Sequence, residues 1–327
     1  MQIIKTLYII GNGFDIHHGM PTAFKDFYNW MKTRHYFDAL SQVDEIYGFS
    51  NEQWWGDLEN SLGELDMCEY ALQQTRENYP DFSSDDFRES DRYQAAFQAE
   101  LDIMQMQRNM KSRFAEWIEG MQAPDSNKML PISIQDTYFI SFNYTPTLEL
   151  LYRVPSGQIL HLHGSVYDDG EYILGNGKSH EQLYSALLVQ EPSPSPNASQ
   201  NEIQEFYENN YDSIYEDTKE KVVDCIASMQ KPVDEIIENN RHVFNSLKDV
   251  ERVCVYGLSF SDVDIKYIAE IIDNHKSPLA IQWEISYYLE RDKAKIMRFV
   301  SDYHIPEKNI QLLTLDELQN KNQLSLF

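Results

Sequence analysis

Six short apolar runs, rich in β-branched and aromatic residues and bounded by turn-forming residues, constrain the fold more than any other feature of the chain. They predict buried strands at 6–10, 137–142, 158–162, 252–256, 279–285 and 310–315. Strands this apolar, when helical stretches separate them, are typical of parallel sheets that are covered on both faces. We therefore predict an α/β, Rossmann-like fold with a mostly parallel sheet covered by helices.

The stretches between the predicted strands are long and carry a helical pattern. Apolar residues such as Ile103 and Met106 recur at spacings of three and four, which indicates an amphipathic helix. We expect a single α/β nucleotide-binding-like domain over residues 1–327, with one helical insertion at about 36–130 and another at about 180–247.

Composition limits the partners and the compartment of this protein. Lys and Arg number 27 against 53 Asp and Glu, so the net charge is −26, which opposes binding to double-stranded nucleic acid and to anionic lipid. No apolar run approaches the roughly 20 residues that span a bilayer. Cys68, Cys225 and Cys254 show neither metal-ligand nor disulfide spacing, which suits a reducing cytosol. We expect a cytoplasmic protein with no membrane contact, no direct double-stranded nucleic-acid binding and no metal.

The first predicted strand runs directly into the sequence GNGFD at residues 11–15. Ligands of open parallel sheets bind at the carboxyl ends of the strands, and glycines there allow close approach of backbone N–H groups to a phosphate. Ile16 takes the place of the third glycine of the dinucleotide fingerprint, so an ordinary dehydrogenase is disfavoured. The alternative interpretation is a plain strand-to-loop turn.

A second polar segment, SFNYTP at residues 141–146, follows the second predicted strand. Asn143 would project from the strand end, where it could hold a ribose hydroxyl or a water molecule. Thr145 could cap the next helix, with Pro146 at its first position. A turn asparagine without a ligand is the alternative for Asn143.

A third segment, HLHG at residues 161–164, contains two histidines. On an extended strand His161 and His163 would share one face. His163, next to Gly164 at the strand tip, is a candidate general base near neutral pH. A metal-binding pair and a structural histidine are the alternatives.

The fourth segment, YGLSFSDVD at residues 256–264, lies where a strand leads into a helix. Ser261 and Asp264 have the spacing of a capping box. Gly257 and Ser259 stand just before the helix N-terminus, where an anion can bind. Simple helix capping is the alternative.

Several motifs together resemble the bacteriophage abortive infection AbiH family. They are YIIGNGFDIHHGMPTAFKDF at the start of the chain, then WGDLENSL, SFNYT, HLHGSV, YGLSFSDVD and WEISYYLERD. The resemblance extends over nearly the whole chain, and it implies a role in defence against phage.

A more distant likeness concerns the sirtuins. GNGFD with HGMPTAF is similar to the glycine-rich opening of sirtuins, HLHG to their catalytic His-Gly, and YGLSFSDVD to their NAD-contacting Gly-Ser loop. This likeness implies cleavage of the nicotinamide–ribose bond of NAD, with His163 as base and Asn143 ordering ribose or water. Thr145 stands where sirtuins carry Asp, and their zinc-binding cysteines have no counterpart, which puts protein deacylation in doubt.

The sequence therefore predicts an antiphage effector that hydrolyses NAD as its substrate. The candidate nucleotide-binding residues are Gly11, Asn12, Gly13, Phe14, Asp15, Thr22, Gly164, Gly257, Ser259 and Asp262. A non-catalytic nucleotide-binding sensor or partner subunit of a defence system is the main alternative, and a metal-dependent nuclease using His161 and His163 is a weaker one. Assembly into a homo-oligomer, or with a defence-system partner, is left open.

Overall fold

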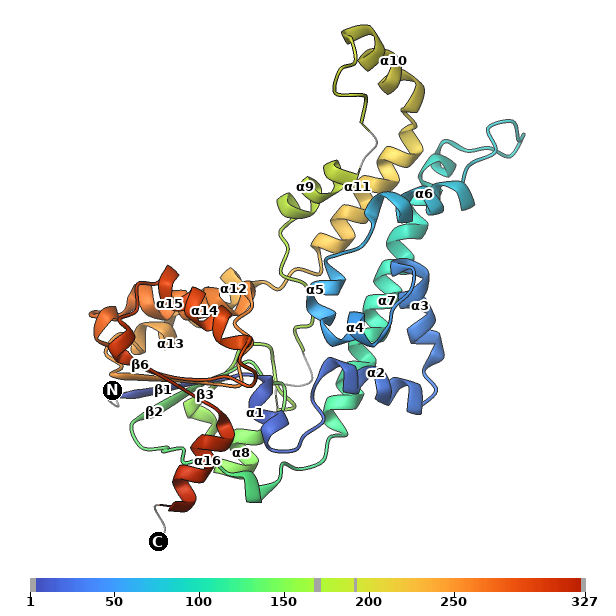
Figure 1. Cartoon of the computed structure of the whole chain (residues 1–327). Coiled ribbons are helices and arrows are strands. Elements are labelled where there is room, and N and C mark those ends of the chain that lie inside the picture. The colour runs from blue at the N-terminus through green and yellow to red at the C-terminus, as the bar shows by residue number, and fades with distance from the viewer. Residues whose placement is uncertain (1–3, 168–171, 191–192, 325–327) are drawn as a thin grey trace. The chain divides into compact units, whose positions relative to one another are not determined.

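The computed structural model describes residues 4–167, 172–190 and 193–324. The chain forms two compact units, and each is described separately below (Figure 1). The first, here called the sheet unit, comprises Met1–Phe27, Phe114–Ile173 and Pro232–Phe327. The second, here called the helical unit, comprises Tyr28–Arg113 and Leu174–Lys231.

The sheet unit is built on one six-stranded parallel sheet. Its strands are β1 (Thr6–Ile10), β2 (Thr137–Ser141), β3 (Ile159–His161), β4 (Arg252–Tyr256), β5 (Gln282–Ser286) and β6 (Ile310–Leu313). Their order is β3-β2-β1-β4-β5-β6, and every pair of neighbours is parallel. The predicted α/β, Rossmann-like fold is confirmed.

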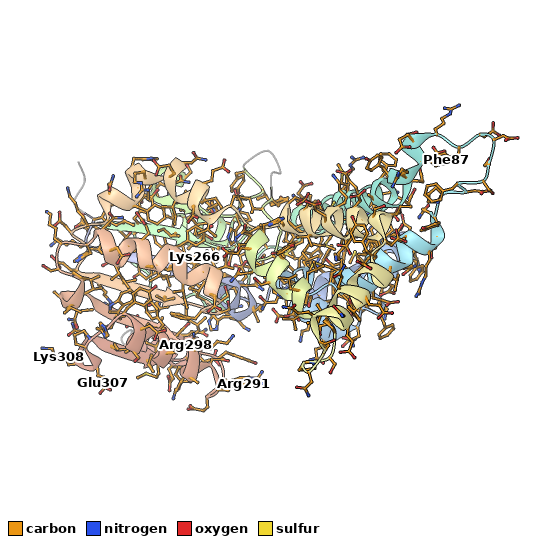
Figure 2. All side chains as sticks on the ribbon, turned by 90° about the horizontal axis from the view of Figure 1, so that it is seen from above. Phe87, Lys266, Arg291, Arg298, Glu307 and Lys308 are labelled. Carbon is orange, nitrogen blue, oxygen red and sulfur yellow. The ribbon has the colours of Figure 1, made fainter. Side chains whose placement is uncertain are left out.

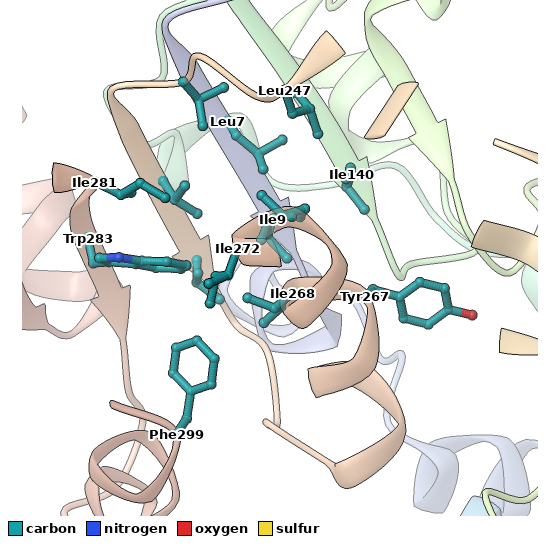
Figure 3. Close-up of a cluster of buried hydrophobic side chains, with 14 of the residues drawn as sticks. Leu7, Ile9, Ile140, Leu247, Tyr267, Ile268, Ile272, Ile281, Trp283 and Phe299 are labelled. Carbon is teal, nitrogen blue, oxygen red and sulfur yellow. The ribbon is translucent and has the colours of Figure 1, made fainter. Parts of the chain in front are cut away.

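Both faces of the sheet are buried, which explains why its strands are mostly apolar. Leu7 and Ile9 of β1 point into one hydrophobic cluster, which also contains Ile140, Trp283 and Phe299 (Figure 3). The alternate residues of β1 point into a second cluster on the other face. Side chains of a strand alternate between the two faces, so a strand covered on both sides is apolar at most of its positions.

Helices cover the two faces of the sheet (Figure 1). The first cluster is closed by α12 (Val233–Asn239), α13 (Arg241–Ser246), α14 (Asp262–Asn274) and α15 (Asp292–Asp302). The second is closed by α1 (Asn12–His17), α8 (Thr147–Tyr152) and α16 (Leu315–Leu324). The covering helices are amphipathic: α14 buries Ile268 while Lys266 is exposed, and α15 buries Phe299 while Arg298 is exposed (Figure 2).

The helical unit contains α3 (Phe37–Tyr47), α4 (Glu52–Gly56), α5 (Leu58–Leu62), α6 (Met67–Glu77), α9 (His180–Gln190), α10 (Gln200–Asn210) and α11 (Ser213–Ala227). Residues of α2 (Phe24–Thr33) and α7 (Gln94–Glu119) are divided between the two units. The amphipathic helix predicted around Ile103 and Met106 is confirmed, because both residues are buried on α7.

The ends of four predicted strands were wrong by one to three residues. The sequence predicted a strand from 279, but Pro278–Ala280 forms a 3-10 turn and β5 begins at Gln282. The last strand was predicted to reach 315, but it ends at Leu313 because Thr314 and Glu317 form reciprocal capping bonds at the start of α16. The second and third strands are also shorter than predicted. Across the part of the chain that the structure describes, none of the helices has the length and apolarity to cross a membrane.

Candidate functional site

The four segments singled out in the sequence follow β1, β2, β3 and β4, which are neighbours in the sheet. Because these strands are parallel, their carboxyl ends lie at the same edge. The chain order of the strands reverses between β1 and β4, and ligands of doubly wound sheets bind at such a reversal. The centre of the candidate site is therefore the edge at β1 and β4.

The glycines after β1 and β4 allow their two loops to touch through the backbone. The N–H of Gly13 donates to the carbonyl of Gly257 at 2.8 Å. Gly257 has a φ of +69°, and a Cβ built on it would lie 2.1 Å from the backbone nitrogen of Phe14. A Cβ on Gly11 would lie 2.6 Å from the Gly257 oxygen. Close backbone contact therefore accounts for all three glycines, whether or not a phosphate binds there.

Two other predicted nucleotide-binding residues of the first segment have different surroundings. The side-chain amide of Asn12, which is exposed, donates to the carbonyl of Thr22 at 2.9 Å. The ring of Phe14 is fully buried and packs against His18 and Tyr152, with ring centroids 4.5 and 5.7 Å away. The side chain of Phe14 therefore packs in the hydrophobic core, and its backbone lies at the contact between the loops after β1 and β4.

Asn143 connects the end of β2 to the first glycine loop. Its Nδ2 donates to the carbonyl of Gly11 at 3.1 Å, and its own N–H donates to the hydroxyl of Ser141 at 3.2 Å. Its Oδ1 is buried and accepts no hydrogen bond within the part of the chain that the structure describes. A buried carbonyl oxygen without a donor costs free energy, so this atom is suited to receive a donor from a ligand or from water.

Asp15 is the most unusual group at this edge, with 1% of its surface exposed. The hydroxyl of Thr145 donates to its Oδ2, whereas no donor among the described residues reaches its Oδ1. Burial raises the pKa of Asp15 to about 6, and the polar side chains of Thr145, Thr147 and Asn143 act in the opposite direction. The sequence suggested Asp15 as a nucleotide contact, but it gave no sign of this buried pairing.

The predicted capping role of Thr145 was wrong. Pro146, not Thr145, stands at the N-cap of α8, and no side chain caps that helix. Instead the Thr145 hydroxyl donates to Asp15 and lies 3.2 Å from the hydroxyl of Thr147. The Thr145 hydroxyl therefore bonds to the buried carboxylate of Asp15 and does not cap the N-terminus of α8.

The two histidines at the end of β3, His161 on the strand and His163 just after it, contact different elements. Nε2 of His161 lies 2.9 Å from Glu149 of α8, and its Nδ1 lies 3.1 Å from the carbonyl of Asn143. His163 is 3% exposed, and its ring packs edge-on against Phe142 and Tyr267. The prediction that both share one strand face was wrong, because β3 ends at His161 and the chain turns before His163.

The remaining predicted residues lie just beyond β3 and β4. Gly164 follows His163 with a φ of +83°, a conformation that favours glycine. The Ser259 hydroxyl donates to the Asp264 carboxylate at 3.1 Å, and Asp262 is exposed at the start of α14. One of the two hydrogen bonds of the predicted capping box is present, from the N–H of Asp264 to the hydroxyl of Ser261. In place of the second, the Asp264 carboxylate accepts a hydrogen bond from the hydroxyl of Ser259.

Over residues 4–167, 172–190 and 193–324, no group of three or more His, Cys, Asp or Glu side chains is arranged to hold a metal ion. His161 is instead bound to Glu149 and to the Asn143 carbonyl.

The raised pKa of Asp15 predicts a pH-dependent effect of replacing it with asparagine. Its pKa in the folded protein, about 6, lies above the ordinary 3.8, so its contribution to stability is complete below pH 4 and is lost as the pH rises through 6. Between pH 5 and pH 8 the wild type should therefore lose roughly 1–2 kcal/mol of unfolding free energy through this carboxyl group. Asp15→Asn should not lose it, because asparagine does not titrate. Urea unfolding at both pH values measures this difference.

Asp273→Asn, on the exposed side of α14, is the matched control and should lose as much as the wild type does. A difference between Asp15→Asn and wild type that stays constant from pH 5 to pH 8 would contradict the prediction.

The fold and the edge together define a doubly wound, Rossmann-like α/β protein with glycine turns and a buried polar cluster at its strand-order reversal. Residues 7–287 match the family described as Bacteriophage abortive infection AbiH, so the chain belongs to the AbiH family. This membership associates the protein with phage abortive infection. Neither the curated proteins nor the solved structures that were compared with the chain gave a match.

Proposed function

We propose that this AbiH protein acts in abortive infection by hydrolysing NAD at the nicotinamide–ribose bond, at the carboxyl edge of its sheet. The observation that carries the proposal is the meeting of Asn143, Asp15 and the two glycine loops where the strand order reverses. Doubly wound sheets bind nucleotides at this position. The likeness of the GNGFD, HLHG and YGLSFSDVD motifs to those of sirtuins supports NAD as the nucleotide.

The proposed reaction needs one water molecule and no further reactant. The bond between the ribose C1′ and the pyridinium nitrogen breaks, and its electron pair stays on nicotinamide, which leaves as a neutral molecule. The water oxygen bonds to C1′ and a base takes its proton. The products are nicotinamide, ADP-ribose and a proton. The transition state carries positive charge on the ribose, so nearby carboxylate charge stabilises it.

The side chains at the edge have the chemistry that these steps require. Asn143, with its unbonded Oδ1, would order the ribose or the attacking water. His163 would be the base that takes the proton, as the sequence suggests. Asp15, beside Asn143 and Thr145, would supply negative charge near the ribose as the reaction proceeds.

A direct test is to incubate the purified protein with NAD and to separate the products by liquid chromatography. We expect nicotinamide and ADP-ribose to appear in equal amounts, at a rate proportional to protein concentration. NAD that stays intact in the presence of the protein, with and without lysate of phage-infected cells, would contradict the proposed hydrolysis.

One observation favours a second candidate, a nucleotide-binding sensor without turnover. Asp15, Asn143 and His163 are 1%, 5% and 3% exposed, and Gly13 is hydrogen-bonded to Gly257 across the edge. When the edge is closed in this way, a bound nucleotide could be sensed through a change in the contact between the loops after β1 and β4. Calorimetric binding of NAD without release of nicotinamide would favour the sensor over the enzyme.

A further inference from the structure

A pocket of about 290 Å³ lies within the sheet unit, beside the buried pair of Asp15 and Thr145. Its wall includes Thr145 and Thr147 from the turn after β2 and the start of α8. The rest of the wall is largely apolar and includes Met20, Met121 and Leu150. The polar side chains of the wall are those of the two threonines, Glu119 and Gln122.

The two threonines of the pocket are connected by hydrogen bonds to a buried carboxylate. Thr145 donates its hydroxyl to Asp15. The Thr147 hydroxyl donates to the sulfur of Met20 at 3.2 Å and also lies 3.2 Å from the hydroxyl of Thr145. The Thr145 hydroxyl oxygen can accept a hydrogen bond from a ligand while its own O–H still donates to Asp15. Because hydrogen bonds in a chain polarise one another, the carboxylate makes this oxygen a better acceptor.

The charges around the pocket select against anions. Among the described residues that line it, none is Lys, Arg or His, and one is the acid Glu119. Asp15 adds a second carboxyl group behind Thr145. A phosphate or carboxylate placed here would meet only like charge, whereas a neutral or cationic group would not.

The size and the sulfur atoms of the pocket indicate a small aromatic occupant. A volume of about 290 Å³ lies just below the range of roughly 300–1,000 Å³ that holds drug-sized ligands, so the occupant is compact. Met20 and Met121 both line the pocket, and thioether sulfur makes favourable contacts with aromatic rings.

We propose that this pocket binds a single aromatic ring that carries a neutral or cationic hydrogen-bond donor, which faces Thr145 and Thr147. The ring lies among Met20, Met121 and Leu150, and the donor binds the threonine hydroxyl that Asp15 polarises. This inference does not rest on the cleavage of NAD, because the contacts belong to the pocket alone.

Three probes of nearly the same shape test the inference: benzamide is neutral, benzamidine is cationic and benzoate is anionic. Ligand-observed NMR titration at pH 8 should give dissociation constants of about a millimolar for the first two, as expected for so few atoms. Benzoate should bind at least about tenfold more weakly, because it offers no donor and carries like charge. Equal binding of benzoate and benzamide, or no binding of any probe, would overturn the inference.

Variants then locate the binding site. Leu150 lines the pocket but is 43% exposed, so Leu150→Trp should fill the pocket without disturbing the core and abolish benzamide binding. Leu279→Trp, at an exposed position elsewhere in the sheet unit, is the matched control and should bind benzamide as the wild type does. Thr147→Val should weaken benzamide binding several-fold, since it removes one hydroxyl and keeps the shape.

Asp15→Asn completes the set because it removes the charge behind Thr145 and keeps the shape. It should weaken benzamidine more than benzamide. Benzamide binding that survives Leu150→Trp would place the site elsewhere and overturn the inference. A protein that cleaves NAD but binds none of the probes would overturn only this inference, and one that binds benzamide but leaves NAD intact would overturn only the proposed hydrolysis.

Discussion

Replacing His163 with glutamine is expected to lower the rate of nicotinamide release by roughly 10²–10⁴-fold, the usual effect of removing a general base. Asn143→Ala should have an effect of similar size, because the attacking water or the ribose would lose its ordering group. The double variant should be scarcely slower than either single one, since residues that act as one catalytic unit are not additive. Initial rates from chromatography of the products give all three values.

Glutamine is preferable to alanine at position 163 because of what surrounds the imidazole. The ring is 3% exposed and packs against Phe142, Tyr144 and Tyr267, so alanine would open a cavity and cost about 3 kcal/mol or more. Glutamine fills more of the space and keeps hydrogen-bonding groups.

His242→Gln, at an exposed position on α13, is the matched control and should keep full activity. Thermal unfolding of each variant separates a loss of chemistry from a loss of fold. If His163→Gln remains folded and releases nicotinamide at the wild-type rate, His163 is not the base.

Gly257→Ala is expected to destabilise the protein by roughly 2–6 kcal/mol, the sum of a strained backbone and an overpacked contact. The φ of +69° disfavours any residue with a side chain. The new Cβ would also lie 2.1 Å from the backbone nitrogen of Phe14, and backbone atoms cannot move aside as the end of a flexible side chain can. Urea unfolding of the two proteins gives the difference directly.

Gly157→Ala is the matched control, because a Cβ on Gly157 meets no atom within 4 Å and its φ is not in the left-handed region. This change should alter the unfolding free energy by about 0.5 kcal/mol or less. If Gly257→Ala is as stable as Gly157→Ala, the contact between the loops after β1 and β4 does not exist in solution.

The strands could be predicted from the sequence because a strand buried on both faces is apolar at most of its positions, and such runs are visible locally. Thr6–Ile10 and Arg252–Tyr256 were predicted to the residue. Errors arose only at strand ends, where a cap or a 3-10 turn decides the boundary, as at Thr314 and at Pro278–Ala280.

Part of the candidate site could also be predicted. Polar segments that follow apolar strands had to meet at one edge once the strands were parallel, and Gly11, Asn143 and Gly257 are in direct contact there. The chemistry assigned to these residues stays a prediction. The pairing of Asp15 with Thr145 could not be predicted, because a threonine before a proline is equally suited to cap a helix.

The sequence by itself determined the class of fold and the segments at the site, because hydrophobic patterning and turn residues act over a few neighbouring positions. Only the tertiary structure decided the strand order β3-β2-β1-β4-β5-β6 and the contact of Gly13 with Gly257. It also decided that Asp15 is buried against Thr145, a residue 130 positions away. Contacts of this kind depend on how helices and strands pack, and packing joins residues whose separation along the chain leaves no local pattern.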